Sequence, residues 1–201
     1  MRDRKAEKSY SGSVATLIRV TGELCDTASE FWGCEVGVSE GKTSRALLVA
    51  FPELRLIMVD AWSTYPPDHP YRLSGDHHAK LTAEEQHRHY RQALENTEFA
   101  KGRRSICRMD SLAASKSIMD GELAMAMIDA DHTFGGVTRD LMAYWPKLGP
   151  GGVMFLHDVG HPRDKRGLWG VTRAAMEFSL NYQVGFHVEG DVGWMVKETG
   201  C

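Results

Sequence analysis

Short apolar segments that end in a polar residue, alternating with helical patterns, constrain the fold of this chain most strongly. We expect five of them to be buried strands: FWGCEVGV, LRLIMVD, RRSICRM, LAMAMIDA and VMFLHD. Between them, apolar residues recur at the three- and four-residue spacing of amphipathic helices. Strands that alternate with helices favour a parallel sheet with helices on both faces. The pattern therefore predicts a doubly wound α/β fold.

The end of the chain departs from this alternation. Two further predicted strands, YQVGFHV and GWMVKE, are separated only by a turn around 189–193. A parallel pair needs a crossover of about a dozen residues, so these two strands must pair antiparallel. Helices are expected at 13–28, 42–53, 82–97, 137–148 and 171–178, and a long loop at 61–82. Thr82 and Glu85 have the spacing of a capping box.

Length and composition limit the domain organisation and the classes of function that this chain can have. The 201 residues are the size of one domain, and we expect a mobile polar tail over 1–12 followed by a single domain over 13–201. The net charge of −3 gives no strong field for nucleic acid or an anionic membrane. No apolar run reaches the ~20 residues that span a bilayer. The four cysteines lack C-x-x-C spacing, which indicates reduced thiols in a cytoplasmic protein.

Polar side chains lie at the ends of the predicted strands, where open α/β sheets bind their ligands. They are Glu35, Asp60, Asp110, Asp129, His157 and Asp158. The first strand leads into the turn EVGVSEGKTS, in which Gly37 and Gly41 let a ligand approach the backbone ahead of a helix N-terminus. Asp60, at the end of the next strand, is placed to accept hydrogen bonds from two ribose hydroxyls. The sequence therefore predicts a nucleoside site.

The same turn indicates which nucleoside is bound. The dinucleotide pattern G-x-G-x-x-G requires a glycine two residues after Gly37, and that residue is Ser39. Lys42 is the turn's only basic residue, and Glu35 disfavours an anionic ligand and favours a cationic one. A ligand with an adenosine and a positive centre fits better than a nicotinamide dinucleotide.

Several motifs carry a family resemblance. EVGVSEGKTS, VDAW, RMDS, IDADHTFGGVTRDL and PGGVMFLHD follow one another, and with them residues 30–198 resemble the class I S-adenosylmethionine-dependent methyltransferases. The chain is most similar to the small group containing the macrolide-sugar O-methyltransferases, and more distantly similar to the catechol and caffeoyl-CoA O-methyltransferases. The resemblance implies a seven-stranded Rossmann-like sheet of order 3-2-1-4-5-7-6 with an antiparallel last strand.

The resemblance also implies S-adenosylmethionine as the cofactor and a set of residues that bind it. These are Glu35, Gly37, Ser39 and Gly41 around the methionine part, Asp60 on the ribose, Ala61 and Trp62 beside the adenine, Asp110 and Ser111 at the adenine edge, and Asp129 at the same site. Asp110 and Ser111 are also typical of a helix N-cap, and both roles can coexist.

Carboxylates and histidines follow the fourth and fifth strands, whose ends are neighbours in such a sheet. Carboxylates from two adjacent strands can hold a hard divalent cation. The resemblance implies Asp129, His157 and Asp158 as ligands of a divalent metal such as Mg²⁺ or Mn²⁺. The relatives mostly have an acid where this chain has His157, and imidazole suits Mn, Fe or Zn better than Mg. A hydrogen-bonded polar cluster without an ion is the alternative.

His132, three residues after Asp129, matches the general base of the sugar-methylating relatives. An aliphatic hydroxyl is a poor nucleophile, and a histidine that removes its proton lowers the barrier. The predicted reaction is therefore in-line methyl transfer to a hydroxyl of a small molecule, with His132 and Asp129 as catalytic residues and the segments 61–82 and 159–169 as a lid. A loop histidine bonded to the backbone is the alternative. We expect the histidines of the polar region to be solvent-exposed: His77, His78, His87 and His89.

Three other function classes fit parts of the pattern. A nucleic-acid methyltransferase often carries Pro-Pro-aromatic after the fourth strand, whereas this chain has DADH there. Ser39, in place of a glycine of the G-x-G-x-x-G pattern, argues against a nucleotide-dependent oxidoreductase. A non-catalytic S-adenosylmethionine-binding protein stays open. The sequence also leaves open the methyl acceptor, the identity of the metal and whether the chain forms a homo-oligomer.

Overall fold

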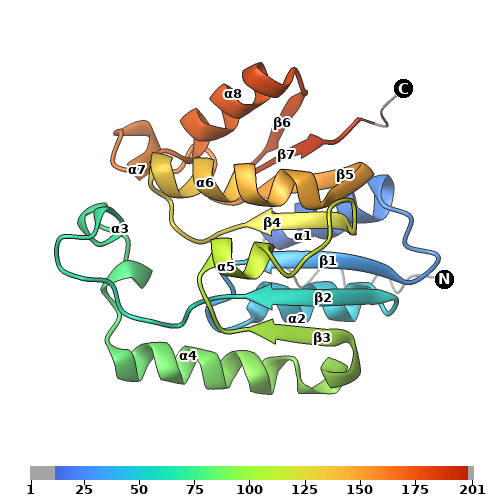
Figure 1. Ribbon diagram of the computed structural model, residues 1–201, viewed down its shortest axis with the longest axis horizontal. Coiled ribbons are helices and arrows are strands. Elements are labelled where there is room, and N and C mark those ends of the chain that lie inside the picture. The colour runs from blue at the N-terminus through green and yellow to red at the C-terminus, as the bar shows by residue number, and fades with distance from the viewer. Residues whose placement is uncertain (1–11, 199–201) are drawn as a thin grey trace.

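One sheet of seven strands organises the computed structural model, which describes residues 12–198 (Figure 1). The strand order is β3-β2-β1-β4-β5-β7-β6. The strands are β1 Phe31–Val36, β2 Leu54–Val59, β3 Arg104–Cys107, β4 Leu123–Ile128, β5 Leu148–Leu156, β6 Phe186–Glu189 and β7 Val192–Val196. The first five run parallel, and β7 is antiparallel to both β5 and β6. This confirms the predicted fold class and strand order.

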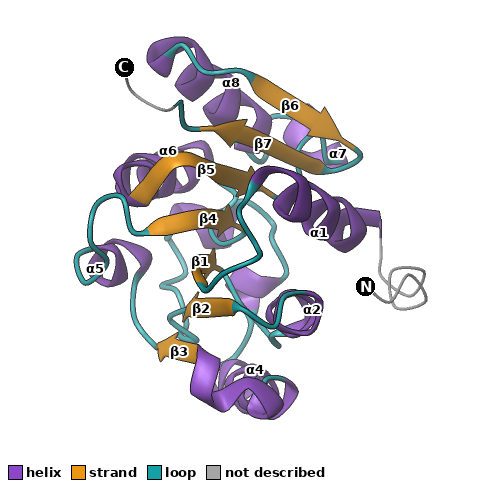
Figure 2. Ribbon diagram, turned by 90° about the vertical axis from the view of Figure 1, so that its right-hand side faces the viewer, coloured by secondary structure: helices purple, strands orange, loops and turns teal. Residues whose placement is uncertain are grey.

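Helices cover both faces of the sheet (Figure 2). One layer contains α1 Gly12–Leu24, α2 Lys42–Ala50 and α4 Ala83–Asn96, and the other α5 Ser111–Ser115, α6 Phe134–Tyr144 and α8 Val171–Tyr182. The central strands β1, β2 and β4 are buried almost throughout, which explains why they read as continuous apolar runs in the sequence. The outer strands β3 and β6 are more exposed and more polar.

All five predicted helices form, with bounds that differ from the predicted ones by a few residues. The first begins at Gly12 and ends at Leu24 instead of residue 28. The tail predicted over 1–12 otherwise lies outside the described residues. The capping box is confirmed, because Thr82 Oγ1 accepts from the Glu85 amide while the Glu85 carboxylate accepts from the Thr82 amide. Within 12–198, no helix is long and apolar enough to cross a membrane.

The long loop at 61–82 contains two short helical turns, α3 Pro70–Leu73 and η2 His78–Lys80. A further short helix, α7 Pro162–Lys165, lies in the loop that follows β5. Both segments lie at the edge of the sheet to which the parallel strands point (Figure 1). We name them after their predicted role: lid 1, residues 61–82, and lid 2, residues 159–169.

Sheet hydrogen bonding continues one residue beyond the parallel strands. The amide of Gly37 donates to Val59 O at 2.9 Å, that of Asp129 to Val36 O at 2.8 Å, and that of His157 to Ile128 O at 3.1 Å. The first residues after β2, β1, β4 and β5 are therefore fixed side by side: Asp60, Gly37, Asp129 and His157. This edge of the sheet positions the candidate site.

Candidate active site

The glycine-rich turn after β1 has a backbone that needs its glycines. Gly37 has a φ of 94°, and a Cβ there would overlap the carbonyl of Asp129 on the neighbouring strand. Gly41 has a φ of 73° and packs against Ala93 of α4, with 3.0 Å between an added Cβ and the Ala93 Cα. Both conformations are accessible to glycine at little cost. The turn therefore stays close to β4 and α4 and leaves its other side to a ligand.

Asp60 holds this turn in place. Its Oδ2 accepts from the amides of Val38 at 3.0 Å and Ser39 at 2.9 Å, and its Oδ1 accepts from the Trp62 amide at 2.7 Å. Trp62 Nε1 in turn donates to Ser39 O at 2.8 Å. Two carboxylate oxygens offer about four lone pairs, so three amide donors leave Asp60 with acceptor capacity. The predicted ribose-binding residue thus also organises the backbone of the turn.

Glu35 lies beneath the turn and is 1% exposed. Ser44 of α2 donates a hydrogen bond to its Oε2. Burial, reinforced by the nearby carboxylates of Asp129 and Asp60, raises the pKa of Glu35 to about 8. The side chain is therefore mostly uncharged at neutral pH, although the sequence suggested a negative charge at this point.

Helix α4 contacts the turn through residues to which the sequence assigned no role at the site. His89 is buried, and its Nδ1 lies 3.2 Å from the Ser39 hydroxyl. Asn96 donates to Glu40 O at 2.9 Å. The prediction that His89 is solvent-exposed is wrong, because α4 turns this face toward the glycine-rich turn. His77, His78 and His87 are exposed, as expected.

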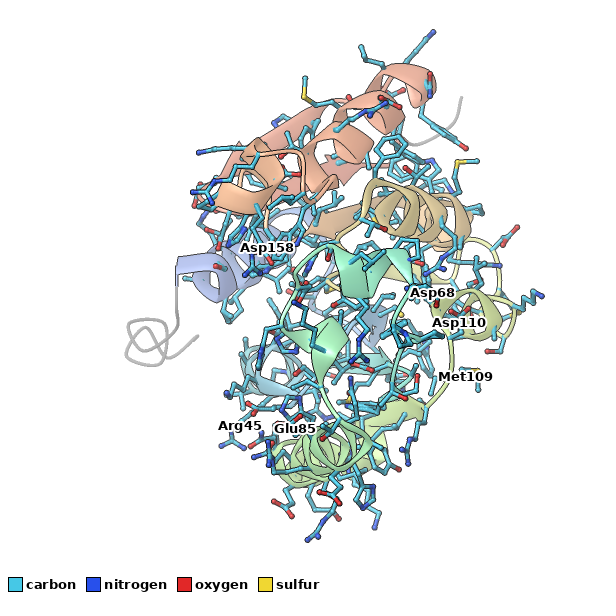
Figure 3. All side chains as sticks on the ribbon, turned by 90° about the vertical axis from the view of Figure 1, so that its left-hand side faces the viewer. Arg45, Asp68, Glu85, Met109, Asp110 and Asp158 are labelled. Atoms are coloured by element: carbon cyan, nitrogen blue, oxygen red, sulfur yellow. The ribbon has the colours of Figure 1, made fainter. Side chains whose placement is uncertain are left out.

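Asp110 and Ser111 begin α5. Asp110 is the N-cap, and its carboxylate accepts from the Leu112 amide at 2.9 Å. Ser111 is buried and donates to Asp140 of α6 at 2.6 Å. Both residues line the same cavity as Asp60. In Figure 3, which looks onto the ends of the parallel strands, Asp110 and Asp158 lie on opposite sides of lid 1.

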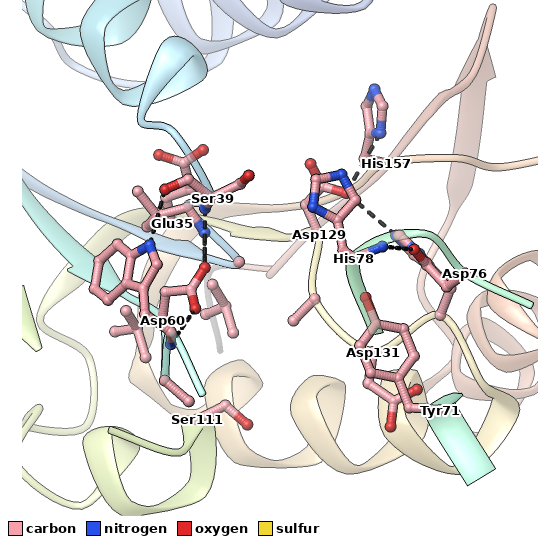
Figure 4. A pocket seen from close by; sticks show the side chains of 18 of the residues that line it. Glu35, Ser39, Asp60, Tyr71, Asp76, His78, Ser111, Asp129, Asp131 and His157 are labelled. Atoms are coloured by element: carbon pink, nitrogen blue, oxygen red, sulfur yellow. Dashed lines mark hydrogen bonds and ion pairs between the residues drawn. The ribbon is translucent and has the colours of Figure 1, made fainter. Parts of the chain in front are cut away.

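A cavity of about 630 Å³ runs along the ends of the strands. Figure 4 shows Glu35, Ser39 and Asp60 on one side of it and Asp129 and His157 on the other. Each residue predicted to bind the cofactor or the cation lines it, with the exception of Gly41. A volume of roughly 300–1,000 Å³ is typical of small-molecule sites.

Two aspartates and two histidines converge at the ends of β4 and β5. His132 Nε2 lies 3.2 Å from Asp129 Oδ1 and 3.5 Å from Asp158 Oδ2. His157 Nδ1 lies 3.4 Å and 3.5 Å from the same two oxygens. The structure therefore brings together the three predicted metal ligands and the predicted base around one point.

Carboxylates control the charge of this cluster. Burial by itself would lower the pKa of His132, but hydrogen bonds to Asp129 and Asp76 outweigh it and raise that pKa to about 10. For His157 too, burial by itself would lower the pKa, but the negative charges of Asp129 and Asp158 outweigh it and raise that pKa to about 11. Burial would raise the pKa of Asp129, but the two imidazoles hold it well below its usual range. Without a metal cation, both imidazoles are therefore positively charged at neutral pH. A cation that binds here must displace a proton from its imidazole ligand.

The ring of His132 is fixed by both lids. Its Nδ1 bonds Asp76 of lid 1 at 2.6 Å. One face of the ring stacks on Trp169 of lid 2, with 4.4 Å between centroids, and Tyr71 of lid 1 lies edge-on at 6.5 Å. Asp76, Tyr71 and Trp169 were missed by sequence reasoning, because a lone side chain in a long loop carries no spacing signal.

The donor set fits a divalent cation. Carboxylate oxygens and an imidazole nitrogen are common ligands of divalent metals. His157 Nδ1 is buried and has no hydrogen-bond partner among the described residues. A nitrogen that faces two carboxylates without bonding either of them is arranged as a ligand would be. Asp129, His132 and Asp158 offer atoms within 4.8 Å of one another, as do His157, Asp158 and Asp191.

The strand order, the glycine-rich turn and the acid after β2 define the class of the S-adenosylmethionine-dependent methyltransferases. Residues 34–159 match a family model described as a methyltransferase domain, and the chain belongs to this family. No curated protein sequence matches the chain.

Solved structures agree on the fold. The SAH-bound Podospora anserina methyltransferase superposes with a TM-score of 0.62 at 13% identity, over 99% of this chain and 83% of that one. A calicheamicin methyltransferase superposes with a TM-score of 0.62 at 13% identity, over 92% of this chain and 77% of that one. The O-methyltransferase NovP superposes with a TM-score of 0.57 at 15% identity, over 96% of this chain and 79% of that one. At these identities the similarity establishes the fold alone.

Proposed function

We propose that this methyltransferase transfers the methyl group of S-adenosylmethionine to a hydroxyl of a small molecule, with help from a divalent cation. The observation that carries the proposal is the His132 ring, which is fixed by Asp76 on one nitrogen and faces Asp129 and Asp158 with the other. A base beside a cation site suits an alcohol, which must lose its proton as it reacts. Two proteins of similar fold, a calicheamicin methyltransferase and the O-methyltransferase NovP, support the same chemistry.

The cofactor half of the cavity is assigned to the side around Asp60. Asp60 accepts the ribose hydroxyls with the lone pairs that the turn leaves free. Ala61 and Trp62 lie beside the adenine, and Asp110 with Ser111 closes the adenine edge. The turn residues Glu35, Gly37, Ser39 and Gly41, together with Asp129, surround the methionine part. This arrangement points the methyl group toward the end of β4.

The acceptor half is assigned to the space between the two lids. Tyr65 and Tyr71 of lid 1 and Trp169 of lid 2 line the cavity beside His132. Their rings exclude water and offer flat surfaces to a small ring-shaped acceptor. The acceptor oxygen attacks the methyl carbon in line, from the side opposite the sulfur; the carbon–sulfur bond breaks, the demethylated cofactor leaves, and the hydroxyl proton passes to His132 Nε2. Asp76 holds the Nδ1–H, so that Nε2 faces the acceptor.

Asp129, His157 and Asp158 would hold the cation. When bound, a divalent ion supplies positive charge that favours the ionised form of an acceptor hydroxyl. Beside that charge, His132 would hold a proton less tightly and could act as the base.

The test is methyl transfer from methyl-labelled S-adenosylmethionine to a panel of sugars, catechols and other small alcohols. The reaction is run with and without Mg²⁺ or Mn²⁺. The expected product carries the label on oxygen. Labelling of amines or nucleic acid with no labelling of any hydroxyl would contradict the proposal, and calorimetry without any S-adenosylmethionine binding would contradict its cofactor half.

A further inference from the structure

We infer that the cation site is built for a transition ion, Mn²⁺, Fe²⁺, Co²⁺ or Zn²⁺, in preference to Mg²⁺, and that Asp191 is the residue that positions its nitrogen ligand. The inference rests on the cation of the proposed function and names its chemical class. It depends on three features around His157: the spacing of its inner nitrogen, the carboxylate behind its outer nitrogen, and a second imidazole nearby.

The inner nitrogen of His157 is spaced as a metal ligand. Nδ1 lies 3.4 Å from Asp129 Oδ1 and 3.5 Å from Asp158 Oδ2. Ligand atoms about 2.1 Å from one metal ion are roughly 3.0 Å apart at neighbouring octahedral positions and roughly 3.4 Å apart in a tetrahedron. These contacts make no hydrogen bond, and Nδ1 is buried without a partner among residues 12–198. Both distances therefore match edges of a coordination polyhedron.

The outer nitrogen of His157 faces a carboxylate that is itself held. His157 Nε2 lies 3.7 Å from Asp191 Oδ2. The other oxygen of Asp191 accepts from the Ser13 hydroxyl of α1 at 2.6 Å, and its backbone carbonyl accepts from Val159 at 3.0 Å. Asp191 thus lies in the β6–β7 turn with one oxygen directed to the ring. A carboxylate behind a ligating histidine fixes which nitrogen binds the metal and makes it more basic.

A second imidazole faces the same two oxygens. His132 Nε2 is 3.2 Å from Asp129 Oδ1 and 3.5 Å from Asp158 Oδ2, and its outer nitrogen also bonds a carboxylate, that of Asp76. Mg²⁺ favours oxygen ligands and near-octahedral geometry, whereas imidazole suits Mn, Fe, Co and Zn. A cation between these oxygens thus borders two imidazoles and has His157 Nδ1 as a nitrogen ligand, a setting that disfavours Mg²⁺, while His132 Nε2 remains the base of the proposed function.

The first experiment measures metal binding directly, without turnover. Chelator-treated protein is titrated with MnCl₂, CoCl₂ or MgCl₂ by calorimetry, and pulsed EPR of the Mn²⁺ form tests for coupling to a histidine nitrogen. Because most sites bind late metals more tightly than Mg²⁺, the decisive comparison is with His157→Asp. We expect this variant to lose at least tenfold in the ratio of Co²⁺ to Mg²⁺ affinity and to show a reduced nitrogen signal.

The second experiment isolates Asp191. Asp191→Asn should weaken Co²⁺ binding about 10- to 100-fold, the usual effect of removing a carboxylate behind a ligating histidine. Glu189→Gln is the matched control, because Glu189 ends β6 beside the same turn but bonds Thr16 and Arg19 instead of the site. Circular dichroism checks that each variant is folded.

The outcomes separate this inference from the proposed function. An unchanged metal ratio in His157→Asp, or no nitrogen coupling, would overturn the inference while cation-assisted methyl transfer stands. Equal Co²⁺ affinity in Asp191→Asn and Glu189→Gln would refute the role of Asp191. No binding of any of the three metals would overturn both the inference and the cation of the proposed function, and leave S-adenosylmethionine binding unaffected.

Discussion

The buried Glu35 makes the pH dependence of stability a direct test of the structure. Its side chain is 1% exposed, and burial raises its pKa to about 8. In the unfolded chain the pKa of the same carboxyl returns to its ordinary value near 4.5. We therefore expect Glu35→Gln, which keeps the shape and the acceptor for the Ser44 hydroxyl but cannot ionise, to become more stable than the wild type as the pH rises.

The sign and size of this stability difference follow from the linkage between protonation and folding. Between about pH 4.5 and 8 the folded protein keeps a proton that the unfolded chain releases, so the wild type loses stability as the pH rises through this window. Below it both states are protonated, and above it the full cost of the buried charge is present. A difference of about 3.5 pKa units at ~1.36 kcal/mol per unit gives an upper value of about 5 kcal/mol. At neutral pH the expected advantage of the variant is about 3 kcal/mol.

The measurement is the free energy of unfolding of both proteins in urea from pH 5 to 9. The difference between them should grow by up to about 1.4 kcal/mol per pH unit and level off above pH 8. Glu53→Gln, at an exposed acid just before β2, is the control and should give a flat difference. A pH-independent difference for Glu35→Gln would show that the carboxyl ionises normally and would refute the burial argument.

Three further predictions concern the site. Asp60→Ala should weaken S-adenosylmethionine binding by about 1–3 kcal/mol in calorimetry, and unchanged affinity in a folded variant would remove Asp60 from the ribose. Excess EDTA should abolish methyl transfer yet preserve S-adenosylmethionine binding, with activity restored by Mn²⁺; full activity under chelation would count against the cation. His132→Ala should lower the turnover rate about 10²- to 10⁴-fold with cofactor affinity nearly unchanged, and Asp76→Asn should lower it less. A wild-type rate of His132→Ala on an aliphatic alcohol would place the base elsewhere.

The fold was predictable because its signals are local. The central strands are buried on both faces and so must be apolar throughout, and each ends where polar residues begin. The sheet then brings the first residues after the strands together through regular hydrogen bonds. For this reason Asp60, Asp129 and His157 could be assigned to one site before any geometry was known.

The remaining parts of the site depend on contacts between distant segments. Asp76 reaches His132 from a loop 56 residues away. Asp191 faces His157 from a turn after the last helix. His89 contacts Ser39 through the orientation of α4, which its mostly polar sequence does not fix. None of these partners has a characteristic spacing, so only the folded chain reveals them.

The charge of Glu35 shows how burial changes an argument made from residue type. The sequence suggested that a negative Glu35 selects a cationic ligand. In the structure the side chain is mostly neutral at pH 7, because burial and two neighbouring carboxylates oppose its ionisation. A neutral Glu35 does not repel an anion, yet it still distinguishes between ligands. A positive ligand in the same cavity lowers the pKa of Glu35 and gains an ion pair with the ionised carboxylate. An anion raises the same pKa further. Selectivity for a positive cofactor then comes from coupling between binding and ionisation, and it should strengthen as the pH approaches 8.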